Sequence, residues 1–158
     1  MKLLGQKPSR IPFTKAGFEK IVQERDELHA QRPEAVEHLR KSREMGDLSE
    51  NGYYKASRAK LSFIDARLRS FEGIIKRAKI VVSTHTGMID IGDSVTLKTD
   101  TVTVEYTIVG GYESDPTKLL ISHVSPLGKA LMGKRVGDMV SVDAPAGTKI
   151  FEILKIGS

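Results

Sequence analysis

The chain has 158 residues, of which 39% are hydrophobic, so it can bury the core of one sizeable domain or of two small ones. It contains no cysteine, which excludes disulfides, thiolate metal sites and cysteine nucleophiles and suits a reducing compartment. The 25 basic and 20 acidic residues leave a net charge of +5, which favours acidic partners but would also serve solubility alone.

Residues 1–13 show neither periodicity nor a motif, and we expect them to form a loose leader. They lack the apolar core of a signal peptide. No apolar run elsewhere approaches the ~18 residues that cross a bilayer. We therefore expect a soluble, cytoplasmic protein without a membrane partner.

A first helix is expected to begin after Thr14, a good N-cap residue that directly precedes a periodic segment. Pro33 lies inside this segment, and we expect it to kink the helix or to split it near Arg32, because proline removes a backbone donor and clashes with the preceding turn. The apolar stripe of this helix is incomplete. It consists of Phe18, Ile21, Val22, Leu28, Val36 and Leu39.

The second helix has the clearest pattern in the sequence, with apolar or small residues at alternating spacings of three and four. This pattern predicts a coiled-coil seam. Only a few residues join the two helices, so residues 14–79 should form an antiparallel hairpin about 45 Å long with a projecting tip. The seam residues are Tyr54, Ser57, Leu61, Ile64, Leu68, Phe71, Ile75 and Ala78.

Residues 80–158 differ in character, with short β-branched segments separated by glycine, proline and aspartate. One short helix is expected near residue 126, with Ser125 as its N-cap and Gly133 as its stop. Residues 91–95 and 136–140 are weakly similar in sequence, and each should introduce a strand hairpin. The chain is therefore predicted to be α+β, with a helical hairpin followed by a small α+β domain.

The tip of the hairpin, with a reversal expected at Gly46, carries two carboxylates, Asp47 and Glu50. Their Asp-x-x-Glu spacing is typical of a capping box for the second helix, and two such carboxylates at a projecting tip could instead serve chemistry. Basic residues on both sides of the tip could contact the phosphates of a nucleic acid, although charged residues on a coiled coil are often only a solvated face. These candidates are Lys41, Arg43, Lys55, Arg58 and Lys60.

The motif GDLSEN at residues 46–51, followed by Tyr54 and preceded by Arg32-Pro33, resembles the Gre transcript cleavage factors of bacteria, GreA and GreB. The resemblance runs in the same order from Thr14 to Ile156. Its further motifs are Ser125-Pro126-Leu127, residues 133–138 and residues 144–147.

This resemblance implies that the hairpin enters the secondary channel of RNA polymerase and that a C-terminal domain with an FKBP-like fold docks at its rim. Asp47 and Glu50 would supply ligands to an Mg²⁺ ion of the polymerase active site, which cleaves the 3′ end of backtracked nascent RNA. The factor would be a monomer with no cofactor of its own, and it would not be an enzyme alone. The chain departs from the family pattern at Tyr53, a position that is often acidic, and at Gly52, which replaces a common alanine.

Three alternatives remain at this point. A Gre-fold inhibitor of RNA polymerase would keep the same architecture. A peptidyl-prolyl isomerase would need an aromatic-lined pocket, and the C-terminal half offers only Tyr106, Tyr112 and Phe151. A coiled-coil scaffold or nucleic-acid adaptor would use the tip only as a turn and would tolerate neutral residues at positions 47 and 50.

Overall fold

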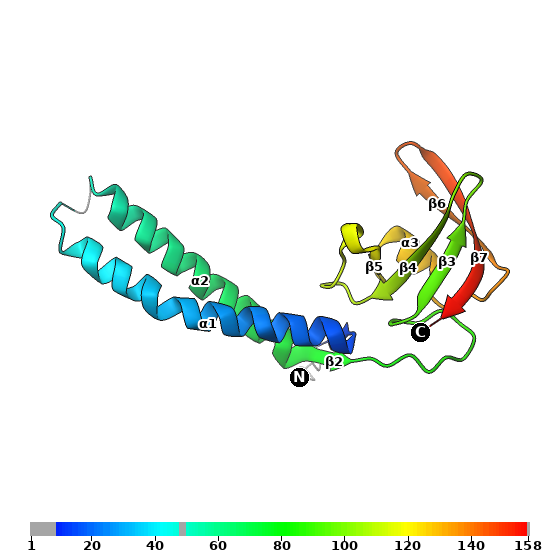
Figure 1. Cartoon of the computed structure of the whole chain (residues 1–158), viewed down its shortest axis with the longest axis horizontal. Coiled ribbons are helices and arrows are strands. Elements are labelled where there is room, and N and C mark those ends of the chain that lie inside the picture. Colours follow the sequence, from blue (N-terminus) through cyan, green and yellow to red (C-terminus); the bar gives the residue numbers. More distant parts are fainter. Residues whose placement is uncertain (1–8, 48–49, 158) are drawn as a thin grey trace, which may run out of the picture. The chain divides into compact units, whose positions relative to one another are not determined.

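The structure, a computed structural model, describes residues 9–47 and 50–157 and divides into two compact units (Figure 1). One unit is Glu19–Arg77, and the other combines Met1–Phe18 with Ala78–Ser158. The first is helical and the second is mainly β, so the α+β class is as predicted. The part of the expected leader before residue 9 lies outside the described residues.

Helices α1 (Lys15–Arg43) and α2 (Gly52–Arg77) form the predicted antiparallel hairpin (Figure 1). Their contacts show the direction: Arg32 bonds to Asp65 at 2.7 Å, and farther along α1 His38 bonds to Tyr53 at 2.8 Å. At about 1.5 Å per residue, 29 and 26 residues give arms of about 44 and 39 Å. Within the described part of the chain, no helix is long and apolar enough to span a membrane.

The buried positions of α1 follow a heptad that the apolar stripe only partly revealed. Ile21, Ala35 and Ser42 are buried, and Leu28, which is half-buried, completes the seven-residue spacing. Val36, which we assigned to the stripe, is 40% exposed. The small residues Ala35 and Ser42 are therefore part of the seam, whereas the larger Val36, which the prediction included, is not.

On α2 the predicted seam is largely correct. Leu61 packs with Ile64 and Leu68 against Leu28 and Ala35 of α1. The far end of the seam differs, because Ile74 is buried and Ile75 is only half-buried. The residues buried on this helix are Ser57, Ile64, Leu68, Phe71 and Ile74.

The start of α1 is as predicted, whereas the expected split at Pro33 is wrong. The Thr14 hydroxyl accepts a hydrogen bond from the Gly17 amide at 3.0 Å, as an N-cap does. The helix continues without a break through Pro33 to Arg43. Proline removes a single backbone donor. Ala35, two residues after Pro33, packs against Ile64 and Leu68 of α2, and this packing outweighs the loss.

Residues 11–13, which we predicted to be part of a loose leader, form strand β1 (Ile11–Phe13). This strand pairs in parallel with β2 (Ala78–Ile80). The Phe13 side chain is 1% exposed and stacks on Tyr112, with ring centroids 6.2 Å apart. Burial of this ring stabilises a strand too short to be recognised by its pattern.

Glu113 joins the start of α1 to the rest of this unit. Its carboxylate accepts hydrogen bonds from the Thr14 amide at 3.0 Å, from the Gly110 amide at 2.8 Å and from the Thr14 hydroxyl. Gly110 lies so close to the chain that an added Cβ would be 2.2 Å from the Pro12 carbonyl oxygen. These bonds fix the path of residues 12–14 in this unit.

The larger sheet has the strand order β5-β4-β3-β7-β6. Its core contains Val95 and Leu97 of β3, Ile108 of β4, Ile153 of β7 and Leu131 of helix α3. Helix α3 begins after Ser125, whose hydroxyl accepts from the Gly128 amide at 3.0 Å, as predicted. The elements are β3 (Ser94–Lys98), β4 (Thr103–Val109), the 3₁₀ helix η1 (Pro116–Lys118), β5 (Leu120–Ser122), α3 (Pro126–Leu131), β6 (Met139–Ala144) and β7 (Gly147–Gly157).

The two similar segments, residues 91–95 and 136–140, form two turns with the same hydrogen bonds. The Gly92 amide donates to the Ile108 carbonyl, and the Gly137 amide donates to the Ile153 carbonyl, both at 2.8 Å. Asp93 and Asp138 each accept from the backbone amide three residues earlier, at 2.9 and 2.8 Å. The two motifs therefore build the same turn at the start of β3 and of β6.

Candidate functional site

The candidate site is the loop between α1 and α2. The chain leaves α1 through a turn in which the Glu44 amide donates to the Lys41 carbonyl at 3.1 Å. Gly46 then adopts a φ of 109°, a left-handed conformation that other residues rarely reach, so the predicted reversal at Gly46 is correct. Residues 48 and 49 of the motif lie outside the described residues.

Asn51 caps α2, so our expectation that Asp47 and Glu50 form its capping box is wrong. The Asn51 side-chain oxygen accepts a hydrogen bond from the Tyr54 amide at 3.1 Å, and α2 begins at the next residue, Gly52. A cap must directly precede the first helical residue. Asp47 lies too far before Gly52 for that role.

Asp47 and Glu50 are both exposed, on the two sides of the undescribed pair of residues. Carboxylate oxygens are ligands that Mg²⁺ prefers, and this ion commonly takes only one or two protein carboxylates. The two side chains therefore fit an ion shared with another molecule. Among the described residues, no group of three or more potential ligands could hold a metal ion.

Four of the five basic candidates are exposed next to this loop: Lys41 and Arg43 at the end of α1, and Lys55 and Arg58 at the start of α2. Lys41 lies 3.8 Å from Glu37, an exposed pairing that contributes little. The basic residues in the last turn of α1 also interact favourably with the helix dipole, so part of their role is structural.

Arg40 is also basic and close to the loop, but it is engaged in ion pairs. Its guanidinium lies 2.8 Å from Glu37 and 2.5 Å from Glu44. The hydrogen bond from Arg40 holds the pKa of Glu37 below its ordinary value. A phosphate would have to displace two carboxylates to reach this side chain.

Sequence reasoning missed the bonds that tie the two helices together behind the loop. The Asn51 amide nitrogen donates to the Ser42 carbonyl at 3.0 Å, and His38 bonds to Tyr53. Ser42 is fully buried, and its hydroxyl donates to the Leu39 carbonyl at 2.8 Å. An asparagine directly before a helical segment was the one signal that could have indicated this arrangement.

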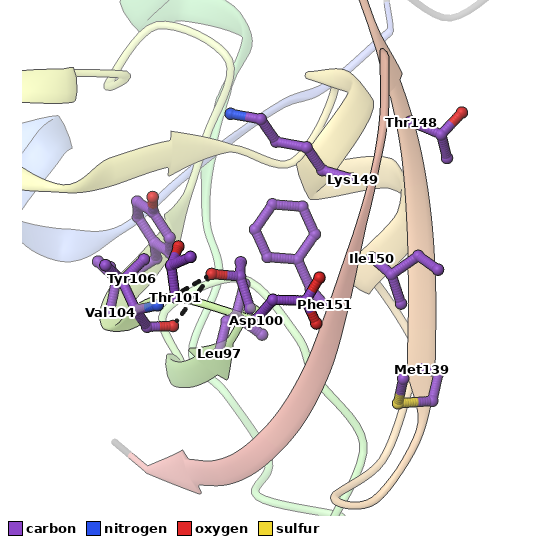
Figure 2. Close-up of a pocket in the computed structure, with 12 residues that line it drawn as sticks. Leu97, Asp100, Thr101, Val104, Tyr106, Met139, Thr148, Lys149, Ile150 and Phe151 are labelled. Atoms are coloured by element: carbon purple, nitrogen blue, oxygen red, sulfur yellow. Dashed lines mark hydrogen bonds between the residues drawn. The ribbon is translucent and has the colours of Figure 1, made fainter. Parts of the chain in front are cut away.

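A second candidate site lies in the mainly β unit, which we call the C-terminal unit. It is lined by residues of β3, β4, β6 and β7 and of the turn between β3 and β4. A cavity of about 550 Å³ brings together Tyr106 and Phe151, two of the three aromatic residues of this half. Figure 2 shows the Lys149 side chain along one side of it and Asp100 near the Phe151 ring. The other lining residues are Leu97, Thr99, Thr101, Val102, Val104, Met139, Thr148 and Ile150.

Two family models match the chain and cover both units. Residues 11–80 match the model described as "Transcription elongation factor, N-terminal", and residues 84–158 match "Transcription elongation factor, GreA/GreB, C-term". The chain belongs to the GreA/GreB family. Both the hairpin with its tip loop and the C-terminal unit thus lie within regions that define this family.

Curated relatives agree with this assignment along almost the whole chain. Transcription elongation factor GreA of Rickettsia bellii (strain OSU 85-389) is 42% identical over 153 residues, covering 94% of this chain and 95% of the relative. The GreA of a Nitratiruptor species is 38% identical over 149 residues, covering 92% and 91%. Among solved structures, GreA factor homolog 1 of Thermus thermophilus is 31% identical, with 94% and 99% coverage and a TM-score of 0.44.

Proposed function

We propose that this protein is a transcription elongation factor that binds RNA polymerase and stimulates the cleavage of backtracked RNA at the polymerase's own active site. The observation that carries this proposal is that Asn51, and not Asp47 or Glu50, caps α2. The two exposed carboxylates lie at the far end of arms about 40 Å long, before the residue that caps the helix. Membership of the GreA/GreB family supports the same activity.

In this mechanism the hairpin enters the secondary channel and brings its tip to the extruded 3′ end of the RNA. The carboxylates of Asp47 and Glu50 would donate oxygen ligands to an Mg²⁺ ion that the polymerase also holds and would orient the attacking water. Such an ion stabilises charge on the attacking and leaving oxygens of an in-line displacement. Two carboxylates alone offer too few ligands for a tight site, so we expect the isolated protein to cleave nothing.

The exposed side chains of Lys55 and Arg58, together with Lys41 and Arg43, would guide the extruded RNA by contacts to its phosphates. These contacts depend on charge and carry no sequence preference. The C-terminal unit would dock at the rim of the channel. We expect the factor to act as a monomer in the bacterial cytoplasm, where its polymerase works.

The deciding experiment adds the protein to stalled, backtracked elongation complexes that carry labelled RNA. Shortening of the RNA from its 3′ end, absent without the factor, supports the proposal. Binding that slows elongation without any cleavage would instead support the inhibitor of the same fold. A protein that neither binds nor affects the polymerase would leave only a scaffold role.

The cavity between Tyr106 and Phe151 favours one further candidate function, the isomerisation of prolyl peptides by the C-terminal unit. A cavity of this volume, lined by both apolar and polar side chains, is of the size that binds small ligands. A prolyl-peptide isomerisation assay tests it. Activity that is lost in Phe151→Ala would support this second role, and no activity in the wild type would remove it.

A further inference from the structure

We propose that Asn51 is a positioning residue that fixes the separation of the two helix ends and thereby holds Asp47 and Glu50 in register for a shared metal ion. The inference rests on the proposed function. Asn51 itself would not touch the ion or the RNA. It would act through Glu50, its neighbour in the chain, and through the two helix ends to which its side chain bonds.

Both polar atoms of the Asn51 side chain are used, and they bond to different helices. The oxygen accepts from the Tyr54 amide in the first turn of α2 at 3.1 Å, and the nitrogen donates to the Ser42 carbonyl in the last turn of α1 at 3.0 Å. Amides at the start of a helix and carbonyls at its end have no partner within the helix. One side chain therefore bonds to the start of α2 and to the end of α1, where the Ser42 carbonyl also accepts from the Met45 amide at 3.4 Å.

The acceptor of this bridge is a backbone carbonyl in the last turn of α1, at a residue, Ser42, that is fully buried. Ser57 of α2, also small, is buried as well. Small buried residues let the two helices approach closely here, so that the Asn51 side chain, next to the start of α2, can reach the Ser42 carbonyl of α1.

The bridge closes the loop at its base, because Ser42 and Asn51 lie just outside the two ends of the segment that carries the carboxylates. Ligands of a shared ion must be held to within about 0.5 Å of their productive positions. Without the bridge the loop would keep its sequence and its charges, but Glu50 would lose the fixed neighbour that sets its position.

Three variants separate the bridge from the cap. Asn51→Ser keeps a good N-cap for α2, but its shorter side chain cannot reach the Ser42 carbonyl at the same time. Asn51→Ala removes both functions. Ser42→Ala serves as the matched control, since the bridge uses the backbone carbonyl of Ser42 and not its hydroxyl.

The first measurement does not use cleavage at all. The chain contains no cysteine, so spin labels can be placed at Met45→Cys and Lys55→Cys, both exposed positions, and their distance distribution measured by pulsed electron spin resonance. We expect a narrow distribution in the wild type and in Ser42→Ala, and a broad one in Asn51→Ser. An unchanged distribution in Asn51→Ser would overturn the bridge as a constraint on the loop.

The second measurement is the Mg²⁺ concentration that gives half-maximal RNA cleavage with saturating factor. Loss of a group that orients a metal ligand typically weakens metal binding by about 10–100-fold, so Asn51→Ser should raise this concentration about tenfold. Polymerase affinity, measured by competition with labelled wild-type protein, should stay unchanged. Loss of helix stability alone would lower the melting temperature and leave the Mg²⁺ dependence of the folded protein as it was.

The outcomes distinguish the two proposals. Wild-type protein that stimulates no cleavage removes the proposed function, while the spin-label measurement still tests the bridge. Wild-type cleavage with an identical Mg²⁺ dependence in Asn51→Ser contradicts the positioning role and leaves the proposed function intact. Asn51→Ala should show the same Mg²⁺ shift together with a lower melting temperature, because it also loses the cap.

Discussion

The Tyr53 hydroxyl lies 2.8 Å from Nδ1 of His38, and the two rings meet edge to face with their centroids 6.1 Å apart. This contact joins the first turn of α2 to α1. On its other side the His38 ring places Nε2 3.4 Å from a Glu34 carboxylate oxygen. The Tyr53 hydrogen bond therefore links the two helices through His38, while the Glu34 contact lies within α1.

Tyr53→Phe should lower the free energy of unfolding by about 0.5–1 kcal/mol, because one partly exposed hydrogen bond between the helices is lost. Tyr54→Phe is the matched control, a neighbouring tyrosine that is half-buried in the seam. Thermal and urea unfolding of the two variants measures the difference. Equal stability of both would mean that the His38 contact adds nothing.

Replacing Asp47 by Asn and Glu50 by Gln together should abolish cleavage while polymerase binding stays intact. Because Asn51 provides the cap of α2, the double variant should keep that cap and avoid the loss of about 1 kcal/mol that removal of an N-cap causes. Glu44→Gln, which removes an exposed carboxylate at the end of α1, serves as the control and should still cleave. Wild-type cleavage by the double variant would refute the role of these two residues as metal ligands.

Charge reversal at Lys55 and Arg58 should slow the cleavage of long extruded RNA more than that of short RNA. A longer strand passes more phosphates along the hairpin, and each lost phosphate contact removes a salt-sensitive contribution to binding. Lys60 points away from these two side chains on the helix and provides the control. Rates are compared for two backtrack lengths at two salt concentrations. A loss that depends on neither length nor salt would identify these residues as an ordinary solvated surface.

Asp65→Asn should lower the melting temperature near neutral pH and have little effect in acid. The hydrogen bond from Arg32 and the charge of that residue hold the pKa of Asp65 below its ordinary value of 3.8. A lowered pKa in the folded state gives stability that is complete above the ordinary value and is lost as pH falls through the folded pKa. Melting curves recorded from acid to neutral pH test this. Asp26→Asn, which breaks a contact between adjacent residues of one helix, should change the melting temperature less.

A fragment of residues 80–158 should fold and compete with the whole protein for polymerase, yet it should stimulate no cleavage. Its core residues, from Ile89 to Ile153, all lie within the fragment. It lacks Phe13 and Thr14, which contact Tyr112 and Glu113, so it should melt at a lower temperature than the same unit does in the whole protein. Circular dichroism and a competition assay measure both properties. A folded fragment that fails to compete would place the docking surface elsewhere.

Local signals in the sequence were sufficient for most of the elements. Thr14 and Ser125 cap helices as predicted, because a cap depends only on the next few residues. Strand β1 was missed because three residues that include a proline carry no pattern, and their partner strand follows the whole hairpin. Helix α1 is not split at Pro33, and the packing between the helices that keeps it continuous cannot be read from one helix alone.

The same limit applies to the tip. From the local sequence, either Asp47 or Asn51 could be the N-cap of α2. The packing of the two helices decides between them, and it starts α2 directly after Asn51. Ala35 and Ser42 were overlooked as seam residues because small side chains do not stand out in an apolar pattern. The bridges from Asn51 to Ser42 and from Tyr53 to His38 require the folded hairpin, and no local pattern encodes them.

The parallel pairing of β1 with β2 has a consequence for the order in which the chain folds. As the protein leaves the ribosome, β1 emerges first and must wait for its partner until the whole of α2 has been made. The contacts between the two helices span fewer residues than the pairing of Ile11 with Ala78, and they can form progressively from the loop between the helices. Once the hairpin has formed, the remaining loop-closure entropy for this pairing is small. The helical hairpin should therefore form before the second unit. Its formation would bring β1 close to β2, so that the two separated segments of that unit can pair.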